Sequence, residues 1–403
     1  MFTPTGKRPH VKLAIIRSSS IGDVVLATAC IDLLKKLDVN FSLTWFGREP
    51  SLTLIAKAFP EITCLDVKRD QTIIQKKLSE SHSDYHAVID LQTNLRSRTF
   101  AHRLGRRLNI PVFSSNKNSL ERAQLVFQAR LRTRSKTPSF FGKKLKTRQF
   151  ELMLDTLKDA LNVLLPLEQQ DKLQQTIATP SFVLSEDKGK YPWQQELKFG
   201  SWLAVAPGAA HPTKRAPLAV TLDILTCLRQ RLADAGKSEK DIGIVFLGSE
   251  QDRRAASDLI DQLGWRGSSL NLSGKLSLWE SALAVSQTQM ILSNDSSLAH
   301  IAEATGVPAA VLFGPTVEAF GFSPWRKESQ SFSVGLGCRP CSKHGKAPCR
   351  YDDQLCFRLI DSDKVAAHIF QRFEDAASAR DMSVKPSSNN KLSQPAPNDD
   401  LRP

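Results

Sequence analysis

The sequence lacks the features of a membrane-spanning or secreted chain. None of its apolar runs approaches the roughly 20 residues that a membrane helix needs, and residues 1–12, MFTPTGKRPHVK, lack the apolar centre of a signal peptide. Cysteine is scarce, at 7 of 403 residues, with three scattered and four close together near the C-terminus. This distribution is unlike the disulfide framework of a secreted domain. We therefore expect a cytoplasmic protein, long enough for two domains.

Two common nucleotide-binding motifs are also missing. No predicted strand is followed by G-x-G-x-x-G or by G-x-x-x-x-G-K-[ST]. These glycine-rich turns hold phosphates in dinucleotide dehydrogenases and in P-loop NTPases. Their absence argues against both enzyme classes.

Acidic residues are nearly absent from one segment, residues 96–148. It contains fifteen Lys or Arg and a single acid, Glu121, so its net charge of +14 equals that of the whole chain. A solvated helical face is the simpler interpretation of a charge run. This run is long, however, and phenylalanines are spaced through it. We therefore favour a surface that binds polyanions, such as anionic lipid head groups, a phosphorylated glycolipid or nucleic acid.

Apolar runs alternate with helical patterns along the first half of the chain. Buried strands are predicted at 13–16, 41–47, 62–67 and 87–92. Helical spacing of apolar residues follows at 24–37 and 51–59, and this alternation predicts parallel β–α units. An amphipathic helix is predicted over 151–165. The polar stretch 168–200 is predicted to connect two domains.

The second half repeats the same architecture. Strands are predicted at 202–208, 242–248, 290–295 and 308–316, each ending near Gly, Ser or Asp. We therefore expect an α/β protein with an N-terminal domain over 1–185 and a C-terminal domain over 200–375. Residues 376–403 are polar and rich in Pro, Ser and Asn, which predicts a disordered tail.

One carboxylate lies where the first predicted strand turns into a helix. In RSSSIGDVV, Asp23 follows Gly22 at the carboxyl edge of the predicted sheet. Open α/β sheets bind ligands at that edge, and a helix start there offers unpaired N–H groups to an anion. The residue type alone favours a simpler role, because Asp is a leading N-terminal cap of helices.

Later strand ends carry groups that suit phosphates and sugars. In APGAAHPTKRAP, Gly208 lets the backbone approach a ligand closely, Thr213 supplies a hydroxyl, and Lys214 and Arg215 supply cations. Glu250, in LGSEQD, follows the next strand, where an acid either holds a ribose hydroxyl or caps a helix.

The richest strand end is SNDSSLAH. Asn294 or Asp295 is predicted to cap a helix whose first N–H groups, with Ser296 and Ser297, would hold an anion well. By spacing alone, His300 is more typical of a structural histidine than of a ligand contact.

Four of these blocks, in order, resemble glycosyltransferase family 9, the bacterial lipopolysaccharide heptosyltransferases. They are RSSSIGDVV, APGAAHPTKR, LSGKLSLWE and SNDSSLAHIAEATGVPAAVLFGPT, and DLQTNLRSR at 90–98 is similar to a further family block. The resemblance extends from residue 12 to about residue 360.

The resemblance implies a GT-B fold, in which two Rossmann-like domains face a cleft, the first binding the acceptor and the second the nucleotide sugar. It implies inverting transfer of heptose from ADP-heptose to the Kdo or heptose of the inner core on lipid A, with no catalytic metal or other cofactor. Because lipid A and the core are phosphorylated, they are implied partners of the basic segment 96–148. The implied location is the inner face of the cytoplasmic membrane, bound peripherally, and nucleic acid is not expected as a partner.

The resemblance also implies roles for single residues. Asp23 would be the base that removes the proton of the acceptor hydroxyl, and Lys214 would stabilise the leaving ADP. Thr213, Ser296 and Ser297 would assist Lys214, Asp295 would orient sugar hydroxyls, His300 would lie near the phosphates, Glu250 would hold the ribose, and Lys275, Leu276 and Ser277 would meet adenine. The further residues expected at the donor or acceptor are Gly208 for the donor and Ser20, Gly22, Gln92, Arg96 and Arg98 for the acceptor.

The chain departs from the family pattern at one position. The family usually has D-[ST]-G-x-x-H, and Ser297 stands here at the glycine. Its side chain narrows the space where the backbone meets diphosphate or sugar. Two alternatives therefore stay open: a family 9 transferase that uses another nucleotide sugar, and a catalytically degenerate protein that binds polyanions.

The four late cysteines form the pattern C-x2-C-x7-C-x6-C. These are Cys338, Cys341, Cys349 and Cys356. Four thiolates within nineteen residues suit a tetrahedral structural zinc site, although the second pair is more widely spaced than a zinc ribbon requires. Free thiols in a loop are the alternative.

Overall fold

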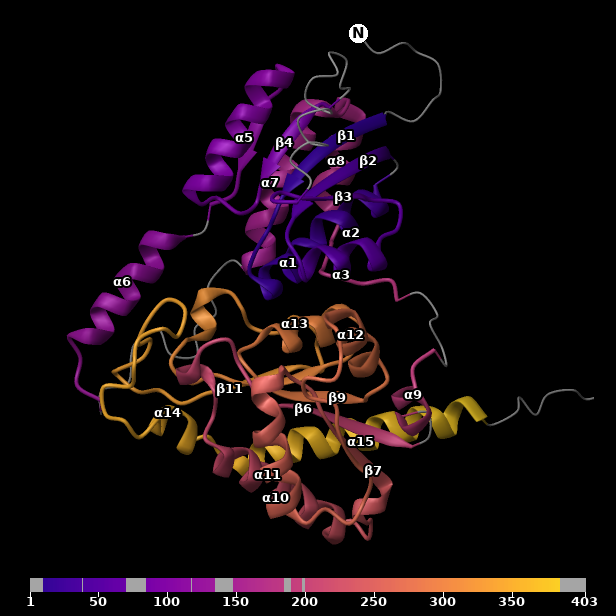
Figure 1. Cartoon of the computed structure of the whole chain (residues 1–403), viewed down its shortest axis with the longest axis vertical. Helices are drawn as coiled ribbons and strands as arrows, with labels where there is room; N and C mark the ends of the chain where they lie inside the picture. The colour runs from indigo at the N-terminus through magenta and orange to yellow at the C-terminus, as the bar shows by residue number, and fades with distance from the viewer. Residues whose placement is uncertain are drawn as a thin grey trace, which may run out of the picture.

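The computed structural model describes residues 10–37, 39–69, 85–116, 118–134, 148–184, 190–197 and 200–384. Figure 1 shows two lobes, each built around one sheet with helices against it. None of the helices in these ranges is long and apolar enough to cross a membrane.

The first lobe contains a five-stranded parallel sheet in the order β3-β2-β1-β4-β5. Its strands are β1 (His10–Ile16), β2 (Asn40–Gly47), β3 (Thr63–Asp66), β4 (Ala87–Asp90) and β5 (Val112–Ser114). From Leu13 to Ile16 the central strand β1 is buried, as expected for a parallel sheet covered on both faces. The helices of this lobe are α1 (Ile21–Ala27), α2 (Ala29–Lys36), α3 (Ser51–Ala58), α5 (Leu95–Leu108), α6 (Ser119–Arg130), α7 (Gln149–Leu164) and α8 (Leu167–Gln175).

The second lobe contains a six-stranded parallel sheet in the order β11-β10-β9-β6-β7-β8. Its strands are β6 (Ser201–Ala206), β7 (Ile242–Phe246), β8 (Ser269–Asn271), β9 (Met290–Asn294), β10 (Ala309–Leu312) and β11 (Gln330–Phe332). The accompanying helices are α9 (Trp193–Leu197), α10 (Leu218–Asp234), α11 (Arg253–Leu263), α12 (Leu278–Ser286), α13 (Ser297–Ala304), α14 (Leu355–Arg358) and α15 (Ser362–Val384).

Both sheets have the doubly wound strand order. Counted from its own first strand, the first sheet reads 3-2-1-4-5 and the second 3-2-1-4-5-6. The order reverses between β1 and β4 in one lobe and between β6 and β9 in the other, and such reversal points form ligand-binding crevices. The predicted α/β architecture with two parallel sheets is confirmed.

The lobes pack directly against each other. One apolar cluster includes Leu54 of α3 and Trp279 of α12, and α1 contacts α13. The N–H of Phe182 donates to the carbonyl of Ala304 at 2.8 Å. These contacts hold the two reversal points near one another.

The prediction for the C-terminal tail is wrong in part, and the predicted connection between the domains contains helices. The predicted connection 168–200 contains most of α8 and all of α9, because Leu173, Trp193 and Leu197 insert into the apolar cluster. The predicted disordered tail begins inside α15, which continues to Val384. This helix is held to the lobe by an apolar side that packs beside α10, and residues 385–403 lie outside the described ranges.

Candidate active site at the cleft between the lobes

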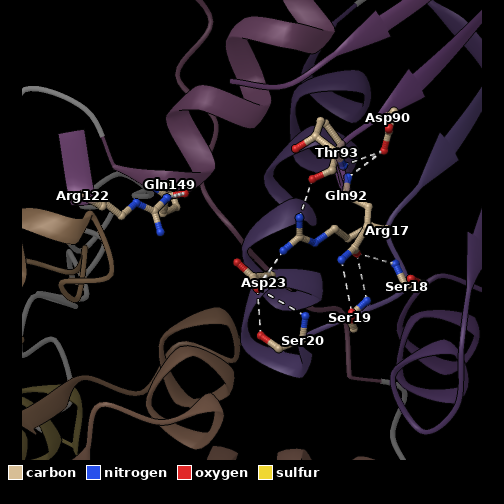
Figure 2. Close-up of polar contacts among 11 residues, drawn as sticks. Arg17, Ser18, Ser19, Ser20, Asp23, Asp90, Gln92, Thr93, Arg122 and Gln149 are labelled. Carbon is tan, nitrogen blue, oxygen red and sulfur yellow. Dashed lines mark hydrogen bonds and ion pairs between the residues drawn. The ribbon is translucent and has the colours of Figure 1, made fainter. Parts of the chain in front are cut away.

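Asp23 lies in the first turn of α1 and is held by three donors. Arg17 Nη2 lies 2.7 Å from Asp23 Oδ2, and the same oxygen accepts hydrogen bonds from the Ser20 hydroxyl at 2.8 Å and the Ser20 N–H at 3.3 Å (Figure 2). The contact with the Ser20 N–H is a capping interaction. The cap residue of α1 is Ser20, so the expectation that Asp23 caps the helix is wrong. Asp23 is the third residue of the helix, it bonds back to the Ser20 N–H, and its carboxylate also lies beside a buried guanidinium.

The loop before α1 is held from β4. Gln92, which is buried, accepts hydrogen bonds from the N–H groups of Ser18 and Ser19, both at 3.1 Å (Figure 2). Asp90 in turn accepts the N–H groups of Gln92 and Thr93 at 2.9 Å. Gln92, expected at the acceptor, therefore supports the loop that presents Ser20 and Asp23.

Arg122 brings a further cation toward Asp23. It comes from α6, is 6% exposed, and donates to Gln149 Oε1 at 2.6 Å. Burial lowers the pKa of Arg122, whereas the charge of Asp23 raises it, so the two groups lie within electrostatic range. Phe322 of the second lobe lies under the guanidinium at 5.5 Å. The sequence interpretation assigned no role to Arg122.

The facing lobe presents a buried ion pair. Lys214 Nζ lies 2.5 Å from Asp295 Oδ2, which also accepts the hydroxyl of Thr316 at 2.7 Å. Burial disfavours the charge of Asp295, but Lys214 and the Thr316 hydroxyl outweigh it and lower the pKa of this carboxyl. Asp295 follows β9, and the cap of α13 is Ser296, so the predicted capping by Asn294 or Asp295 is wrong.

Asn294 instead holds the loop that carries Lys214. Its amide donates to the carbonyl of Pro207 at 2.7 Å and accepts the N–H of Ala216 at 3.2 Å. Both ends of the loop 207–216 are thereby fixed to the end of β9. This arrangement explains how Lys214 meets Asp295 although eighty residues separate them in the chain.

His300 lies where the two lobes meet. A Cβ built on Gly22 would be 2.9 Å from His300 Cδ2 and 3.7 Å from Ser297 Cα, so only glycine allows this approach of α1 to α13. The imidazole stacks on Trp325 at 6.1 Å between ring centroids. Burial lowers the pKa of His300, although Asp295 and Asp23 both raise it. A narrow pocket beside it is lined by Asp295, Ser296 and Phe322 among others.

Gly208 is needed for a contact within the protein. A Cβ at Gly208 would lie 2.4 Å from the carboxylate of Asp252, which is buried. Asp252 accepts the N–H and hydroxyl of Ser249 at 2.8 and 2.7 Å, and Arg215 Nη1 lies 3.5 Å away. Asp252, rather than a ligand, therefore fills the space that glycine leaves here.

The residues expected to bind the nucleoside lie together at the carboxyl edge of the second sheet. Glu250 is exposed, pairs with Arg253 at 2.6 Å, and packs over Gly274. The N–H of Gly274 donates to the carbonyl of Gly248 at 2.9 Å, which brings the loop with Lys275 and Leu276 beside Glu250. The backbone of that loop therefore lies at the carboxyl edge of the sheet, next to the Glu250–Arg253 pair.

The expected acceptor residues divide into two groups. Ser20 and Gly22 lie beside Asp23, whereas Arg96 and Arg98 are exposed on the first turn of α5. Residues 135–147 of the basic segment, including Phe140 and Phe141, lie outside the described ranges.

The predicted zinc site is not formed by the late cysteines. In the described ranges, which include all four, no group of three or more His, Cys, Asp or Glu side chains could hold a metal ion. Cys341 Sγ instead donates to the carbonyl of Cys338 at 3.5 Å. Burial, together with the other thiols, raises the pKa of Cys341 to about 12.

Several residues of the site had no assigned role in the sequence interpretation. Arg17 begins the block RSSSIGDVV, and Thr316 ends the block SNDSSLAHIAEATGVPAAVLFGPT. Each follows a strand, where a polar residue indicates a place in the site. Arg122 carries no such signal, since its importance comes from a contact with Gln149 of another helix.

Comparison with known proteins now gives the context of this site. Residues 230–351 match the model of glycosyltransferase family 9 (heptosyltransferase). A stretch of 116 residues is 32% identical to lipopolysaccharide heptosyltransferase 1 of Campylobacter coli and covers 28% of this chain and 32% of that protein. A stretch of 156 residues is 27% identical to lipopolysaccharide heptosyltransferase 2 of Escherichia coli K12, over 37% and 41% of the two chains. The matches thus span a third to two fifths of these relatives.

Solved structures show the fold. The E. coli ADP-heptose LPS heptosyltransferase II aligns with a TM-score of 0.59 at 16% identity, over 91% of this chain and all of that one. A family 9 glycosyltransferase from Veillonella parvula gives 0.59 at 16% identity over 92% and 99%, and an E. coli heptosyltransferase with ADP gives 0.54 at 17% over 91% and 100%. The chain therefore has the GT-B fold, as the resemblance implies. The family model matches within the second lobe, so residues 230–351 are similar to glycosyltransferase family 9.

Proposed function

We propose that this protein is an inverting glycosyltransferase that moves heptose from ADP-heptose to the inner core of lipopolysaccharide. The observation that carries the proposal is the meeting of the two lobes at His300. The charges of Asp23 from one lobe and of the Lys214–Asp295 pair from the other both act on this histidine. A base and an anion-stabilising cation are what transfer from a nucleotide sugar to a hydroxyl requires.

Asp23 is the proposed base. The charge of Arg17 and the hydrogen bonds from Ser20 stabilise the carboxylate of Asp23. This carboxylate can accept the proton of an acceptor hydroxyl. Arg122, within electrostatic range of Asp23, is suited to a phosphate of the acceptor.

Lys214 is the proposed partner of the leaving diphosphate. Its ammonium group and the first N–H groups of α13 would meet the negative charge that develops on ADP. Glu250 and the loop 275–277 would receive the nucleoside, and Asp295 the sugar hydroxyls. No step in this scheme needs a catalytic cofactor.

A phosphorylated lipid acceptor would be reached at an anionic membrane surface on the cytoplasmic side. Support comes from α6 and the residue that follows it, where the large apolar side chains Leu120, Phe127 and Leu131 are 87%, 62% and 73% exposed. They lie within the basic segment, and the opposite side of α6 packs on Val317 and Phe320 of the second lobe. Figure 1 shows α6 set apart from the first sheet, beside the second lobe.

A thermal-shift comparison tests the donor class. Stabilisation by ADP, with little effect of UDP, GDP or duplex DNA, is the expected result, because binding to the folded state alone raises its stability. Incubation with ADP-heptose and Kdo-lipid A, followed by mass spectrometry, should then detect a heptosylated lipid. Stabilisation by DNA alone would favour a degenerate polyanion-binding protein.

One observation favours an alternative donor sugar. The Cα of Ser297 lies close to Gly22 at the junction of the lobes, so its added side chain is next to the proposed sugar site. A family 9 transferase with a different ADP-sugar is therefore the alternative. Stabilisation by ADP without heptose transfer would point to it.

A further inference from the structure

The cysteine-rich segment touches the loop that carries Lys214. The hydroxyl of Thr213 donates to the carbonyl of Gly345, 132 residues away in the chain. A Cβ built on Gly345 would lie only 2.6 Å from Lys214 Cγ and 3.0 Å from Cδ. The aliphatic stem of Lys214 therefore rests directly on the backbone of Gly345, a contact that no other residue type permits.

The same segment also reaches the other half of the ion pair. Arg339, which is 1% exposed, donates to the carbonyl of Thr316 at 2.7 Å and to that of Phe313 at 3.0 Å. The hydroxyl of Thr316 in turn donates to Asp295, the partner of Lys214. A closed circuit of contacts thus runs from Gly345 through Lys214, Asp295 and Thr316 to Arg339.

Further contacts fix the far end of the segment. The side-chain amide of Gln354 donates to the carbonyls of Arg215 at 3.3 Å and Thr213 at 3.5 Å. On the side of α6, Asp353 pairs with Arg134 at 2.7 Å, and Arg350 donates to the carbonyl of Arg130 at 3.3 Å. The segment is therefore joined both to the Lys214 loop and to the basic segment of the first lobe.

We propose that residues 338–354 form a strap that holds Lys214 against Asp295, and that Gly345 is its positioning residue. The inference rests on the proposed function, because the anion that Lys214 is held to receive is the diphosphate of a nucleotide donor. A side chain at Gly345 displaces Lys214 from the pair and weakens diphosphate binding. Partial burial and the nearby charges of Arg122 and Lys214 lower the pKa of His344, although the charge of Asp23 raises it.

Calorimetric titration of the full-length protein with ADP tests the strap. Gly345 has φ +76°, so Asn, which tolerates this backbone region, is the suitable replacement. Gly345→Asn should weaken ADP binding about tenfold, the scale of one charge-assisted contact. The matched control is Gly236→Asn, because Gly236 has φ +68° and nothing within 4 Å of a built Cβ. It should bind ADP within about twofold of wild type.

A double-mutant cycle separates positioning from a general loss of structure. On a Lys214→Ala background, which itself weakens ADP binding, Gly345→Asn should weaken ADP binding by less than about a further twofold, since the displaced side chain is already gone.

Gln354→Met gives a second route if Gly345→Asn folds poorly. It removes two hydrogen bonds to the Lys214 loop and should weaken ADP binding about threefold.

The outcomes distinguish the strap from the proposed function. Wild-type affinity in Gly345→Asn, or a full tenfold loss on the Lys214→Ala background, overturns the strap. Failure of the wild type to bind ADP counts against the proposed function instead. The crystal structure of Gly345→Asn then decides on the strap: separation of Lys214 Nζ from Asp295 Oδ2 beyond hydrogen-bonding distance supports it, and an unchanged ion pair overturns it.

Discussion

At the scale of single residues, the site depends on charges that are paired before any ligand arrives. Asp23 is paired with Arg17, and Asp295 with Lys214. Asp23, Asp295 and Lys214 were candidates from the sequence, because each lies after a strand inside a recognisable block, and their roles stay predictions. Their partners Arg17 and Thr316 were unassigned, and Arg339 could not be found, because its four carbonyl partners meet only in the folded chain.

Replacing Asp23 tests the proposed base. Asp23→Asn keeps the shape of the side chain but cannot take a proton, so transfer should decrease about 10²–10⁴-fold, the range for loss of general base catalysis. ADP affinity should stay within about twofold, because Asp23 lies on the other lobe from the proposed donor site. Turnover measured with purified enzyme checks the first point and calorimetry the second. Retained turnover would remove Asp23 from the base role.

Lys214→Met leaves the Asp295 carboxylate buried without its cation. Removing one partner of a buried pair costs about 3 kcal/mol or more, so the free energy of unfolding at pH 7 should decrease by that order. The double variant Lys214→Met/Asp295→Asn should recover part of the loss. Denaturant unfolding with all three proteins measures this, and an unchanged midpoint in Lys214→Met would contradict it.

The Lys214–Asp295 pair should also make the free energy of unfolding depend on pH. Lys214 and Thr316 keep the pKa of Asp295 below its usual value of 3.8 despite burial. An acid with a lowered native pKa contributes stability above its unfolded pKa and loses it as the pH decreases through the native value. In Lys214→Met the lowering by Lys214 is lost and burial raises the pKa of Asp295. The stability gap between wild type and this variant should therefore be complete above that raised pKa and decrease as the pH falls through it toward the lowered pKa of the wild type.

At the scale of elements, periodicity predicted the long segments and missed the short ones. The central strands and α7 were predicted to within a few residues, because apolar runs bounded by polar turns mark them clearly. The three-residue strands β5, β8 and β11 carry too few residues for a pattern. α8 and α9 look polar in sequence, since single residues such as Leu173 and Trp193 anchor them.

Helix α6 gives the prediction that belongs to this scale. Changing Leu120, Phe127 and Leu131 together to Ser should weaken binding to vesicles of phosphatidylglycerol and phosphatidylcholine at least about tenfold, because each buried apolar side chain contributes roughly 1.5–3 kcal/mol. The matched control changes Val163, Leu167 and Ile177, which are 68%, 81% and 81% exposed outside the basic segment. Vesicle flotation measures both. An equal loss in the control would rule out α6 as the specific contact.

At the scale of the whole molecule, the doubly wound order repeated in both sheets brings two reversal points together. Alternating strands and helices predicted the two sheets, and the family resemblance implied that they face each other. The closeness of the lobes at one glycine could not be predicted, because it depends on the packing of α1 against α13. In the proposed reaction, the base on one lobe has to reach a donor on the other.

Gly22 is therefore the position where lobe spacing can be changed with least effect on either site alone. Gly22→Ala adds a Cβ that would lie 2.9 Å from His300 Cδ2, and Gly22→Val adds more volume at the same point. Both should decrease the transfer rate, about tenfold for Ala and a hundredfold for Val, since displacements near 1 Å have effects of this size. ADP affinity should change less than about twofold, because Lys214 and Asp295 keep their contacts. Calorimetry measures the ADP affinity of both variants, and a turnover assay measures the transfer rate. A parallel loss of ADP affinity would show that Gly22 supports the donor lobe itself and not the spacing between the lobes.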